Sequence, residues 1–566
     1  MGKKISMIAL AAVTVLSLGL SACSESTDAG EKTGANSPAP NTQQEAAVQA
    51  IQQGTYKFDP PVTITTVKAT DSTMKFKNGE TMENNVHTKW AHDQLGIDLK
   101  FLWQVPGDQF NTKLRLMLTA NESLPDVLMT MDGALMEELM QSGKYEDITA
   151  DFEKYASPKV KQIYNSSPLN WQQVTIGGKK MALPNFRTAG NDNAVMWIRQ
   201  DWLDKLGMKA PTTFEELETL MQAFLDKKPG GSDNVIPLGV SFGSGGSSPN
   251  PFASWLGETT WVFGPYGTVP YQWLEKDGKL VHGSTLPAMK DGLAKLKDWY
   301  NKGYISKEAG LQDENKLGEL IAQGRVGVVV APSWMSGWPQ TDMQKNIPGS
   351  IMKPYPIPTL NGKAVAKDTT YLNGGLLVKK GFQHADALFL YLNRLFAGVN
   401  PDENSEFVNG WFKDYDYTIK SDGTLSSIDK DIPGGKVDPS KYFLMAPTDP
   451  FLGMTIRAKI ARGETPVTPS EKKVAGGVKD GLIAARIVDD GWKAGIYVPQ
   501  AYMGSSTPTM QSKQGILVKL EGDTFLSIIY GKKPVDEFDN FVKEWMSLGG
   551  ENITKEVNEA YQKTKK

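Results

Sequence analysis

The stretch PVTITTVKATDSTMKFKNGETMENNVHTKWAHDQLGIDLKFLW, residues 61–103, decides the predicted fold. It opens on Pro61–Lys68, a run of β-branched residues that is typical of a strand. Thr81–Leu95 then places its apolar side chains near helical spacing, and Ile97–Trp103 returns as a strand. Because strands that alternate with helices over this spacing form βαβ units, the stretch predicts a parallel sheet.

The alternation continues toward the C-terminus. A predicted helix over Asp108–Ala120 is followed by a short buried strand at Asp126–Met129. A second block begins near Ala194, and its predicted elements are the strand Ala194–Arg199, the helix Asp201–Leu206, a hairpin turning at Asp277-Gly278, the buried strand Arg325–Ala331 and helices at about 384–396 and 536–548. Two such blocks in a chain of 566 residues predict an α/β protein with two lobes.

The N-terminus has the pattern of an export signal. Lys3 and Lys4 precede the apolar run Ile5–Leu20, which is short for a membrane span but suits the core of a signal peptide. Small residues then lead into Cys23, the only cysteine of the chain. This segment resembles the lipobox of bacterial lipoproteins, which implies that residues 1–22 are removed and that a lipid is attached to Cys23.

The segment after the lipobox is polar. Residues 23–55 contain no aromatic side chain and many Ser, Thr, Gly, Pro, Asn and Gln residues, so they predict a disordered tether. No later stretch approaches 18 uninterrupted apolar residues, and the lipid is therefore the only membrane contact that we expect.

The composition excludes several classes of protein. Lys and Arg number 61 against 64 Asp and Glu, which gives a net charge of −3 and no basic surplus for nucleic acid. With one cysteine, the chain can form neither an internal disulfide nor a cysteine-based zinc site. Hydrophobic residues at 40% and charged residues at 22% indicate a packed globular body.

Several segments resemble the solute-binding lipoproteins of carbohydrate ABC importers, namely extracellular solute-binding protein family 1 in its Gram-positive oligosaccharide branch. They are Asp108–Leu128, Gly178–Phe186 (GKKMALPNF), Met196–Leu217, Trp273–Leu280, Leu320–Trp334 (LIAQGRVGVVVAPSW), Ser506–Met510 and Phe538–Tyr561. These segments follow the expected order over nearly the whole chain, and it is the ordered set that carries the resemblance.

The resemblance implies a type II periplasmic-binding-protein-like flytrap, in which a sugar binds in a cleft between two lobes that close by hinge motion. It places lobe one in residues 56–185 and 345–400, and lobe two in residues 186–344 and 401–566. It also implies a monomeric, non-enzymatic receptor on the outer face of the cytoplasmic membrane of a Gram-positive bacterium. The implied partners are an oligosaccharide and the permease subunits of an ABC transporter.

Polar candidates for ligand contact lie at the ends of predicted strands, where open α/β sheets bind their ligands. Asp71, Gln104 and Asp132 each follow a predicted strand. Arg187 comes just after a Leu-Pro turn, and its guanidinium fits two hydroxyls or a uronate carboxylate. By family analogy, Asn373 lies at a crossing between the lobes. The alternative for each is an exposed loop residue without a ligand.

Loop tryptophans are candidates too, because the apolar C–H faces of sugars stack on aromatic rings. The resemblance places Trp261 and Trp334 in loops that face the cleft, and Trp255 and Trp411 are further candidates. The core is instead predicted to contain the tryptophans on apolar helix stripes, Trp90, Trp299 and Trp545.

Signals for enzymes and metals are weak. Gly239–Gly243 has the form G-x-S-x-G, but a Ser- and Gly-rich loop follows Ser241 in place of the helix that a nucleophile elbow needs. Alginate binders carry a calcium loop where this chain has residues 226–237, and two lysines and a proline there argue against calcium. We therefore expect no catalytic residue, metal or cofactor. The alternative functions are a binder of peptides or another solute, an exported carbohydrate-active enzyme, and a receptor for a sensor kinase.

Overall fold

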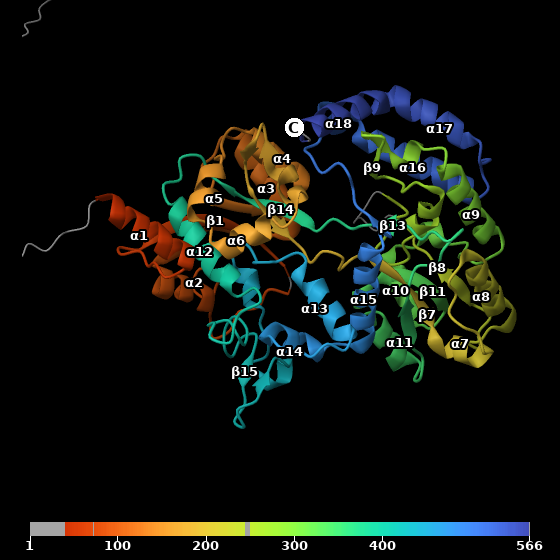
Figure 1. Ribbon diagram of the computed structural model, residues 1–566, viewed down its shortest axis with the longest axis horizontal. Coiled ribbons are helices and arrows are strands. Elements are labelled where there is room, and N and C mark those ends of the chain that lie inside the picture. Colours follow the sequence, from red (N-terminus) through yellow and green to blue (C-terminus); the bar gives the residue numbers. More distant parts are fainter. Residues whose placement is uncertain (1–39, 72, 244–249, 565–566) are drawn as a thin grey trace, which may run out of the picture. The chain divides into compact units, whose positions relative to one another are not determined.

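Two groups of strands organise the chain, and each has its own shell of helices (Figure 1). The computed structural model describes residues 40–71, 73–243 and 250–564. Residues 47–566 form one compact unit, and Met1–Ala46 form another, of which the structure describes only the start of helix α1 (Pro40–Gln53). We call the two groups of strands, with their helices, lobe one and lobe two.

Lobe one contains a parallel pair and an antiparallel sheet. β1 (Val62–Thr70) pairs in parallel with β2 (Ile97–Pro106), which confirms the strands predicted from the opening stretch. β3 (Val127–Thr130) and β6 (Leu183–Phe186) both run antiparallel to β14 (Leu372–Val378), which lies between them. The other elements are α2 (Val86–Trp90), α3 (Gly107–Thr119), α4 (Gly133–Gln141), α5 (Thr149–Tyr155), α6 (Pro158–Tyr164), β4 (Thr175–Ile176), β5 (Lys179–Lys180), α12 (Ala385–Ala397), β15 (Thr418–Ile419) and β16 (Leu425–Ser426).

Lobe two is built on a mixed sheet with the order β12 (Met352–Tyr355), β7 (Ala194–Arg199), β11 (Val326–Pro332), β8 (Ile236–Gly239). β11 runs parallel to β8 and antiparallel to β7, and both β7 and β11 are buried along their whole length. Its other elements are α7 (Gln200–Leu206), α8 (Phe214–Lys227), β9 (Trp273–Lys276), β10 (Lys279–His282), α9 (Met289–Asn301), α10 (Glu314–Ala322), α11 (Gln340–Asn346), β13 (Ala366–Lys367), α13 (Leu452–Ala461), α14 (Pro469–Ala475), α15 (Lys479–Lys493), β17 (Tyr497–Val498), α16 (Pro508–Ile529), α17 (Glu537–Trp545) and α18 (Glu551–Thr564).

The prediction of a parallel sheet is therefore only partly right. A βαβ unit returns each strand in the same direction, as β1 and β2 do. β14, however, enters lobe one from lobe two, and it runs opposite to its neighbours β3 and β6. The reversal depends on how the chain passes between the lobes, which local periodicity does not encode.

Local signals were accurate where a single residue fixes the backbone. The hairpin of β9 and β10 turns at Asp277 and Gly278, whose φ angles of 51° and 76° are those of a tight hairpin turn. The helix predicted from Thr81 begins later, at Val86, because the Asn85 side chain accepts hydrogen bonds from the backbone N–H groups of the first turn. Tryptophans predicted for the core are buried there, namely Trp90, Trp299 and Trp545.

The second and third predicted boundaries of the lobes, at residues 345 and 401, come too early. β12 pairs with β7, so the chain is still in lobe two after residue 345 and leaves it only beyond β13. Phe407, Phe412 and Phe443 belong to the core of lobe one, so residues from 401 onward stay there. The chain is back in the core of lobe two at Met454.

The sequence predicts a disordered tether up to residue 55, but its second half forms helix α1, which ends at Gln53. Ile51 is 3% exposed and belongs to the core of lobe one, and its carbonyl accepts a hydrogen bond from the Asn393 side chain at 2.9 Å. Burial of this apolar side chain stabilises the end of the helix by about 2 kcal/mol. The predicted signal peptide and Cys23 lie outside the described residues.

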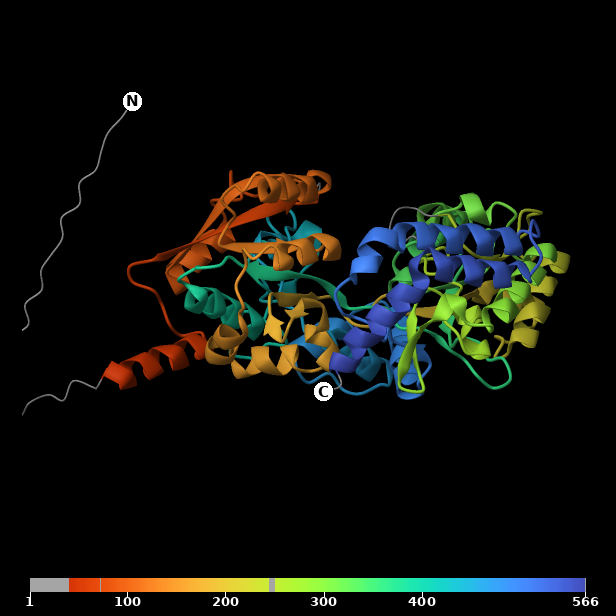
Figure 2. The same ribbon diagram turned by 90° about the horizontal axis from the view of Figure 1, so that it is seen from above.

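The C-terminal helices α16, α17 and α18 pack together on lobe two and are drawn in blue in Figure 2. α16 runs for 22 residues, and Phe525 in its second half contacts Phe541 of α17 at 4.8 Å between ring centroids. Within the described part of the chain, no helix combines the length and the apolar character that crossing a bilayer requires.

A buried polar cluster joins these helices to the hairpin of β9 and β10. The Glu521 carboxyl accepts a hydrogen bond from the Trp545 indole at 2.8 Å and lies 3.9 Å from the ring of His282. Burial raises the pKa of Glu521 to about 8 and lowers the pKa of His282 to about 3. Near neutral pH, both side chains are therefore held mainly in their uncharged forms.

We expect Glu521→Gln to flatten the pH dependence of stability between pH 6.5 and 8. A carboxyl with a raised pKa binds its proton more tightly in the folded state, so its contribution is complete below its unfolded pKa of 4.5 and is lost as the pH rises toward 8. The slope from this group is at most about 1.4 kcal/mol per pH unit.

Urea unfolding at several pH values measures this effect. His282, whose pKa is about 3 when folded and 6.5 when unfolded, gives a slope of the opposite sign at the lower end of this window, and Glu258, whose pKa is raised to about 7, gives a slope of the same sign as Glu521; the variant retains both slopes. Equal slopes in the wild-type protein and the variant would contradict the assignment.

Candidate ligand-binding site

A cavity of about 490 Å³ opens at the carboxyl ends of β1 and β3 in lobe one. We call it the lobe-one pocket, and its lining comprises Thr66–Ala69, Phe101, Gly107, Phe110, Asn111, Met129–Asp132, Phe443 and Leu444. Apolar faces therefore alternate with a few polar groups, as in sites for small ligands.

Asp132 is the N-cap residue of helix α4 and lines this pocket. Its carboxylate accepts hydrogen bonds from the backbone N–H of Leu135 and from the Asn111 amide, both at 2.7 Å. These bonds cap α4 and fix the orientation of the side chain, so that Asp132 and Asn111 form one preorganised polar edge of the pocket.

Lys68 supplies the positive charge of the lobe-one pocket. Its ammonium donates to the carbonyl of Phe443 at 2.6 Å, and burial lowers its pKa to about 8. The negative charge of Asp71 raises the pKa of Lys68 and so opposes the effect of burial. The Asp71 carboxylate is itself paired with Lys441 at 2.9 Å.

The loop of residues 187–193, which we call the crossing loop, leads from β6 in lobe one to β7 in lobe two. Asn193 at its end donates to the carboxylate of Asp368 at 2.6 Å, and the Trp492 indole donates to the other oxygen at 3.1 Å. Gly190 has a φ of 68° and faces the Trp492 ring so closely that a Cβ there would lie 2.4 Å from it. The crossing loop is thus fixed against α15 and against the second connection between the lobes.

Three tryptophans form an aromatic surface after the carboxyl end of β11. The ring of Trp255 lies 5.2 Å from that of Trp334 and 5.8 Å from that of Trp338. Trp338 is 38% exposed, and the other two are partly buried. We call this set the tryptophan wall.

Polar groups connect the tryptophan wall to the crossing loop. The Trp334 indole donates to Asp192 at 3.1 Å, and the Asn191 amide donates to the same carboxylate oxygen at 3.2 Å. Asn191 in turn accepts from the Arg457 guanidinium of α13 at 3.2 Å. Aromatic faces and directed hydrogen-bonding groups therefore lie side by side, which is the combination that a sugar requires.

The structure brings together some of the predicted residues. Trp255 and Trp334 share the tryptophan wall, Arg187 is exposed on the crossing loop, and Asp132 lines the lobe-one pocket. Asn373 lies within β14, where its carbonyl accepts a hydrogen bond from the Asn185 amide at 3.0 Å.

Asp71 and Gln104 stand apart from the pocket. Asp71 follows β1 as predicted, but its carboxylate is held by Thr73 and Lys441, and these bonds lower its pKa to about 2. Gln104 does not follow a strand, because β2 continues to Pro106, and Gln104 is opposite Lys68 in the β1–β2 register.

Two tryptophans require correction. Trp261 is 0% exposed in the core of lobe two, where its indole donates to the carbonyl of Glu258 at 2.9 Å, so a ligand has no face of the ring to stack on. Trp411 packs against Phe407 and Phe443 at 5.0 Å on the core of lobe one, where it supports the wall of the lobe-one pocket.

The candidate residues missing from the sequence prediction are Lys68, Asn111, Asp192, Trp338 and Arg457. Asp192 had a usable signal, since it lies in the same loop as Arg187, and Trp338 was an evident loop tryptophan. Lys68 and Arg457 lie on a regular strand and helix, and only the tertiary structure reveals their burial.

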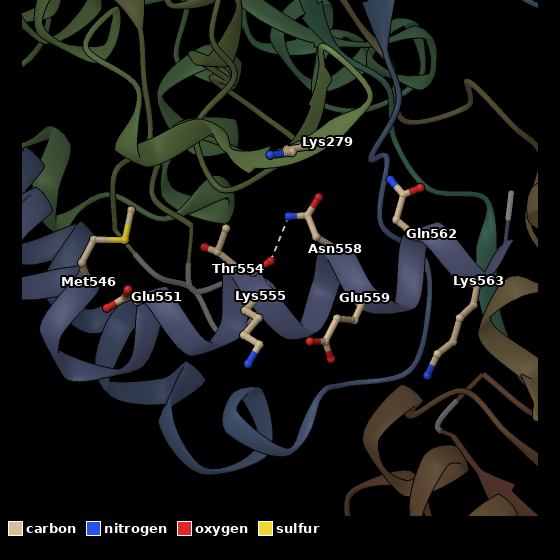
Figure 3. Close-up of a pocket in the computed structure, with 9 residues that line it drawn as sticks. All are labelled: Lys279, Met546, Glu551, Thr554, Lys555, Asn558, Glu559, Gln562 and Lys563. Atoms are coloured by element: carbon tan, nitrogen blue, oxygen red, sulfur yellow. Dashed lines mark hydrogen bonds between the residues drawn. The ribbon is translucent and has the colours of Figure 1, made fainter.

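A larger groove, of about 920 Å³, runs along α18 beside Lys279 (Figure 3). Asn558 and Gln562 point toward the Lys279 side, whereas Lys555 and Glu559 point away from it. The Asn558 side-chain amide accepts a hydrogen bond from the backbone N–H of Leu280 and donates one to the Leu280 carbonyl, both at 2.8 Å. The lining contains no aromatic ring, and we therefore do not assign the ligand site to this groove.

Ser241, and Lys228 of residues 226–237, both have partners within the chain. The Ser241 hydroxyl is buried and donates to the carbonyl of Leu256 at 2.7 Å, so it is committed to the fold. In the stretch compared with a calcium loop, Lys228 forms an ion pair with Asp233 at 2.5 Å. Among the described residues, no group of His, Cys, Asp and Glu has the arrangement of a metal site.

The two lobes with polar and aromatic groups at their strand ends define a solute-binding protein. The model of the bacterial extracellular solute-binding protein family matches residues 75–393, which is more than half of the chain. The chain therefore belongs to this family.

Individual relatives are similar over most of their length. Lipoprotein LipO of Bacillus subtilis is 22% identical over 83% of this chain and 87% of its own, and the polygalacturonan/rhamnogalacturonan-binding protein YtcQ of the same species is 20% identical over 83% and 86%. Among solved structures, the ABC-transporter substrate-binding protein FusA of Streptococcus pneumoniae in complex with kestose matches 89% of this chain and 99% of its own, with a TM-score of 0.59 and 17% identity. This match shows the shared fold.

We expect Trp334→Ala to weaken ligand binding by about 10- to 100-fold, because it removes one of the three rings of the tryptophan wall together with its bond to Asp192. Trp171→Ala is the matched control, since Trp171 is a partly buried tryptophan of lobe one outside the site. Isothermal titration with an oligosaccharide that the wild-type protein binds measures both. Equal affinities of the wild-type protein and Trp334→Ala would remove Trp334 from the site.

Proposed function

We propose that this protein is a lipid-anchored extracellular receptor that captures an oligosaccharide and delivers it to the permease of an ABC transporter. Family membership supports a solute-binding role, and the similarity to the polygalacturonan/rhamnogalacturonan-binding protein YtcQ and to FusA, solved in complex with kestose, supports a carbohydrate as the solute. The single observation in this chain that carries the proposal is the tryptophan wall with Asp192 beside it.

The chemistry of this arrangement favours sugars over peptides. The faces of Trp334 and Trp338 can stack on the C–H faces of pyranose rings, while Asp192 and Asn191 bind ring hydroxyls. Asp132 and Asn111 of the lobe-one pocket offer the same kind of groups on the other lobe. A ligand that touches both lobes stabilises a closed form, and only such differential binding can signal occupancy to a permease.

The remaining features of the proposal concern location and partners. Cys23, at the end of its signal-like segment, is the proposed site of lipid attachment, which places the receptor on the outer face of the cytoplasmic membrane of a Gram-positive bacterium. The receptor acts as a monomer and without catalysis, and its protein partners are the permease subunits.

Titration of residues 24–566 with oligosaccharides, followed by tryptophan fluorescence and calorimetry, tests the proposal. We expect a saturable response with a dissociation constant near the micromolar range, which corresponds to a binding free energy of about −8 kcal/mol. A receptor that delivers its ligand must also release it. The panel consists of pectic, xylan, mannan, glucan, fructan and alginate fragments, with peptide mixtures as the comparison.

The outcomes separate the alternatives. Saturation by a carbohydrate with no change in its chain length supports the proposal. Binding of peptides alone, or release of shorter sugars from the same fragments, contradicts it and points to a peptide receptor or to an exported carbohydrate-active enzyme. Absence of any carbohydrate response across the panel contradicts it as well.

A further inference from the structure

Two cations of the candidate site lack an acidic partner. Arg457 projects from α13, and its guanidinium donates a hydrogen bond to the neutral amide of Asn191 at 3.2 Å. Burial lowers the pKa of this guanidinium, and no carboxylate among the described residues lies within ion-pair distance of it. The nearest acid along the hydrogen-bond chain is Asp192, whose carboxylate already accepts from Asn191 and Trp334.

Lys68 has the same character in lobe one. Its ammonium lines the lobe-one pocket and has a single carbonyl, that of Phe443, as its protein acceptor. Its other surroundings include Asp71, which is paired with Lys441, and His87, which is buried and bonded to Tyr391 at 2.9 Å. Asp132 on the pocket edge is occupied by Leu135 and Asn111. In the described part of the chain, Lys68 thus forms no ion pair.

A desolvated cation without a counter-ion costs free energy. Some partly buried cations of this chain are paired with an acid, as Arg199 is with Asp201 at 2.6 Å. Others, such as Lys159 and Lys367, donate to backbone carbonyls and form no ion pair in the described part of the chain. Arg457 and Lys68 differ from these because both border the site where we place the ligand. An anionic ligand would supply the missing partners.

We propose that the ligand is an acidic oligosaccharide, whose uronate carboxylates pair with Arg457 in lobe two and with Lys68 in lobe one. The inference rests on the proposed function and adds the chemical class of the sugar. A guanidinium can bind a carboxylate through two parallel hydrogen bonds, and the Asn191 contact leaves donors of Arg457 for this purpose. Arg187, exposed on the crossing loop, is a third positive group near the path of the ligand.

The net charge of the whole chain argues that such a preference must be local. With 61 basic and 64 acidic residues, the protein has a net charge of −3 and repels an acidic sugar at long range. A preference for the acid over its neutral ester therefore has to arise from individual cations in the site.

The test compares matched ligands on residues 24–566, which omit the predicted signal peptide and Cys23. Uronic acid oligosaccharides (oligogalacturonate, oligoalginate and glucuronate-containing xylan fragments) are titrated beside their methyl esters, which keep the size and the hydroxyls but remove the charge. We expect the wild-type protein to bind one of the acids at least about tenfold more tightly than its ester. Arg457→Gln and Lys68→Met should each lose about tenfold for the acid and less than about threefold for the ester.

Three further variants control for structural effects. Arg457→Lys and Lys68→Arg keep the positive charge and should retain part of the preference for the acid. Arg486→Gln, on α15, removes a half-exposed arginine that is already paired with Asp490 at 3.3 Å, and it should leave both affinities unchanged. Thermal melting of each variant shows that it is folded.

Each outcome has a distinct meaning. Equal wild-type affinity for acid and ester, or an equal loss of both ligands in Arg457→Gln and Lys68→Met, overturns the inference. Binding of neutral oligosaccharides only also overturns it and leaves the proposed function intact. Failure of every acidic and neutral carbohydrate to bind contradicts the proposed function itself.

Discussion

The carboxylate of Asp368 holds together the segments on which the site depends. It lies just after β13 and accepts hydrogen bonds from Asn193 at 2.6 Å and from the Trp492 indole at 3.1 Å, while its backbone N–H donates to Val498 at 2.8 Å. The crossing loop, α15 and the second connection between the lobes therefore meet at one side chain. Because burial raises the pKa of Asp368 and the hydrogen bonds lower it, these bonds offset part of the cost of its buried charge.

This constraint explains why ligand groups sit where they do. Once Asn193 is fixed, the preceding residues Asn191 and Asp192 are presented to Arg457 and Trp334 at hydrogen-bond distance. Trp334 in turn orients the tryptophan wall through its contact with Trp255. On the other lobe, Asp132 is fixed independently by the α4 cap. Each half of the site is thus preorganised by its own lobe, and movement at the connections would change only their separation.

Much of this could be predicted where the signal is local. The β1–β2 pair, the β9–β10 hairpin, Asp132 after a strand, and the pair Trp255 and Trp334 follow from periodicity, turn residues and resemblance. Trp261 was misplaced because a loop tryptophan and a buried one have the same local sequence signal. The lobe boundaries, the direction of β14 and the unpaired cations Lys68 and Arg457 depend on long-range packing, which no local window contains.

We propose that the solute binds at the tryptophan wall and the crossing loop. A crystal structure of the protein with its tightest-binding oligosaccharide tests this claim most directly. We expect a sugar ring against Trp334, with polar contacts to Asp192 and Arg457 and further contacts to the lobe-one pocket. A sugar seated in the groove along α18, with Trp334 and Arg457 free of contact, would contradict it.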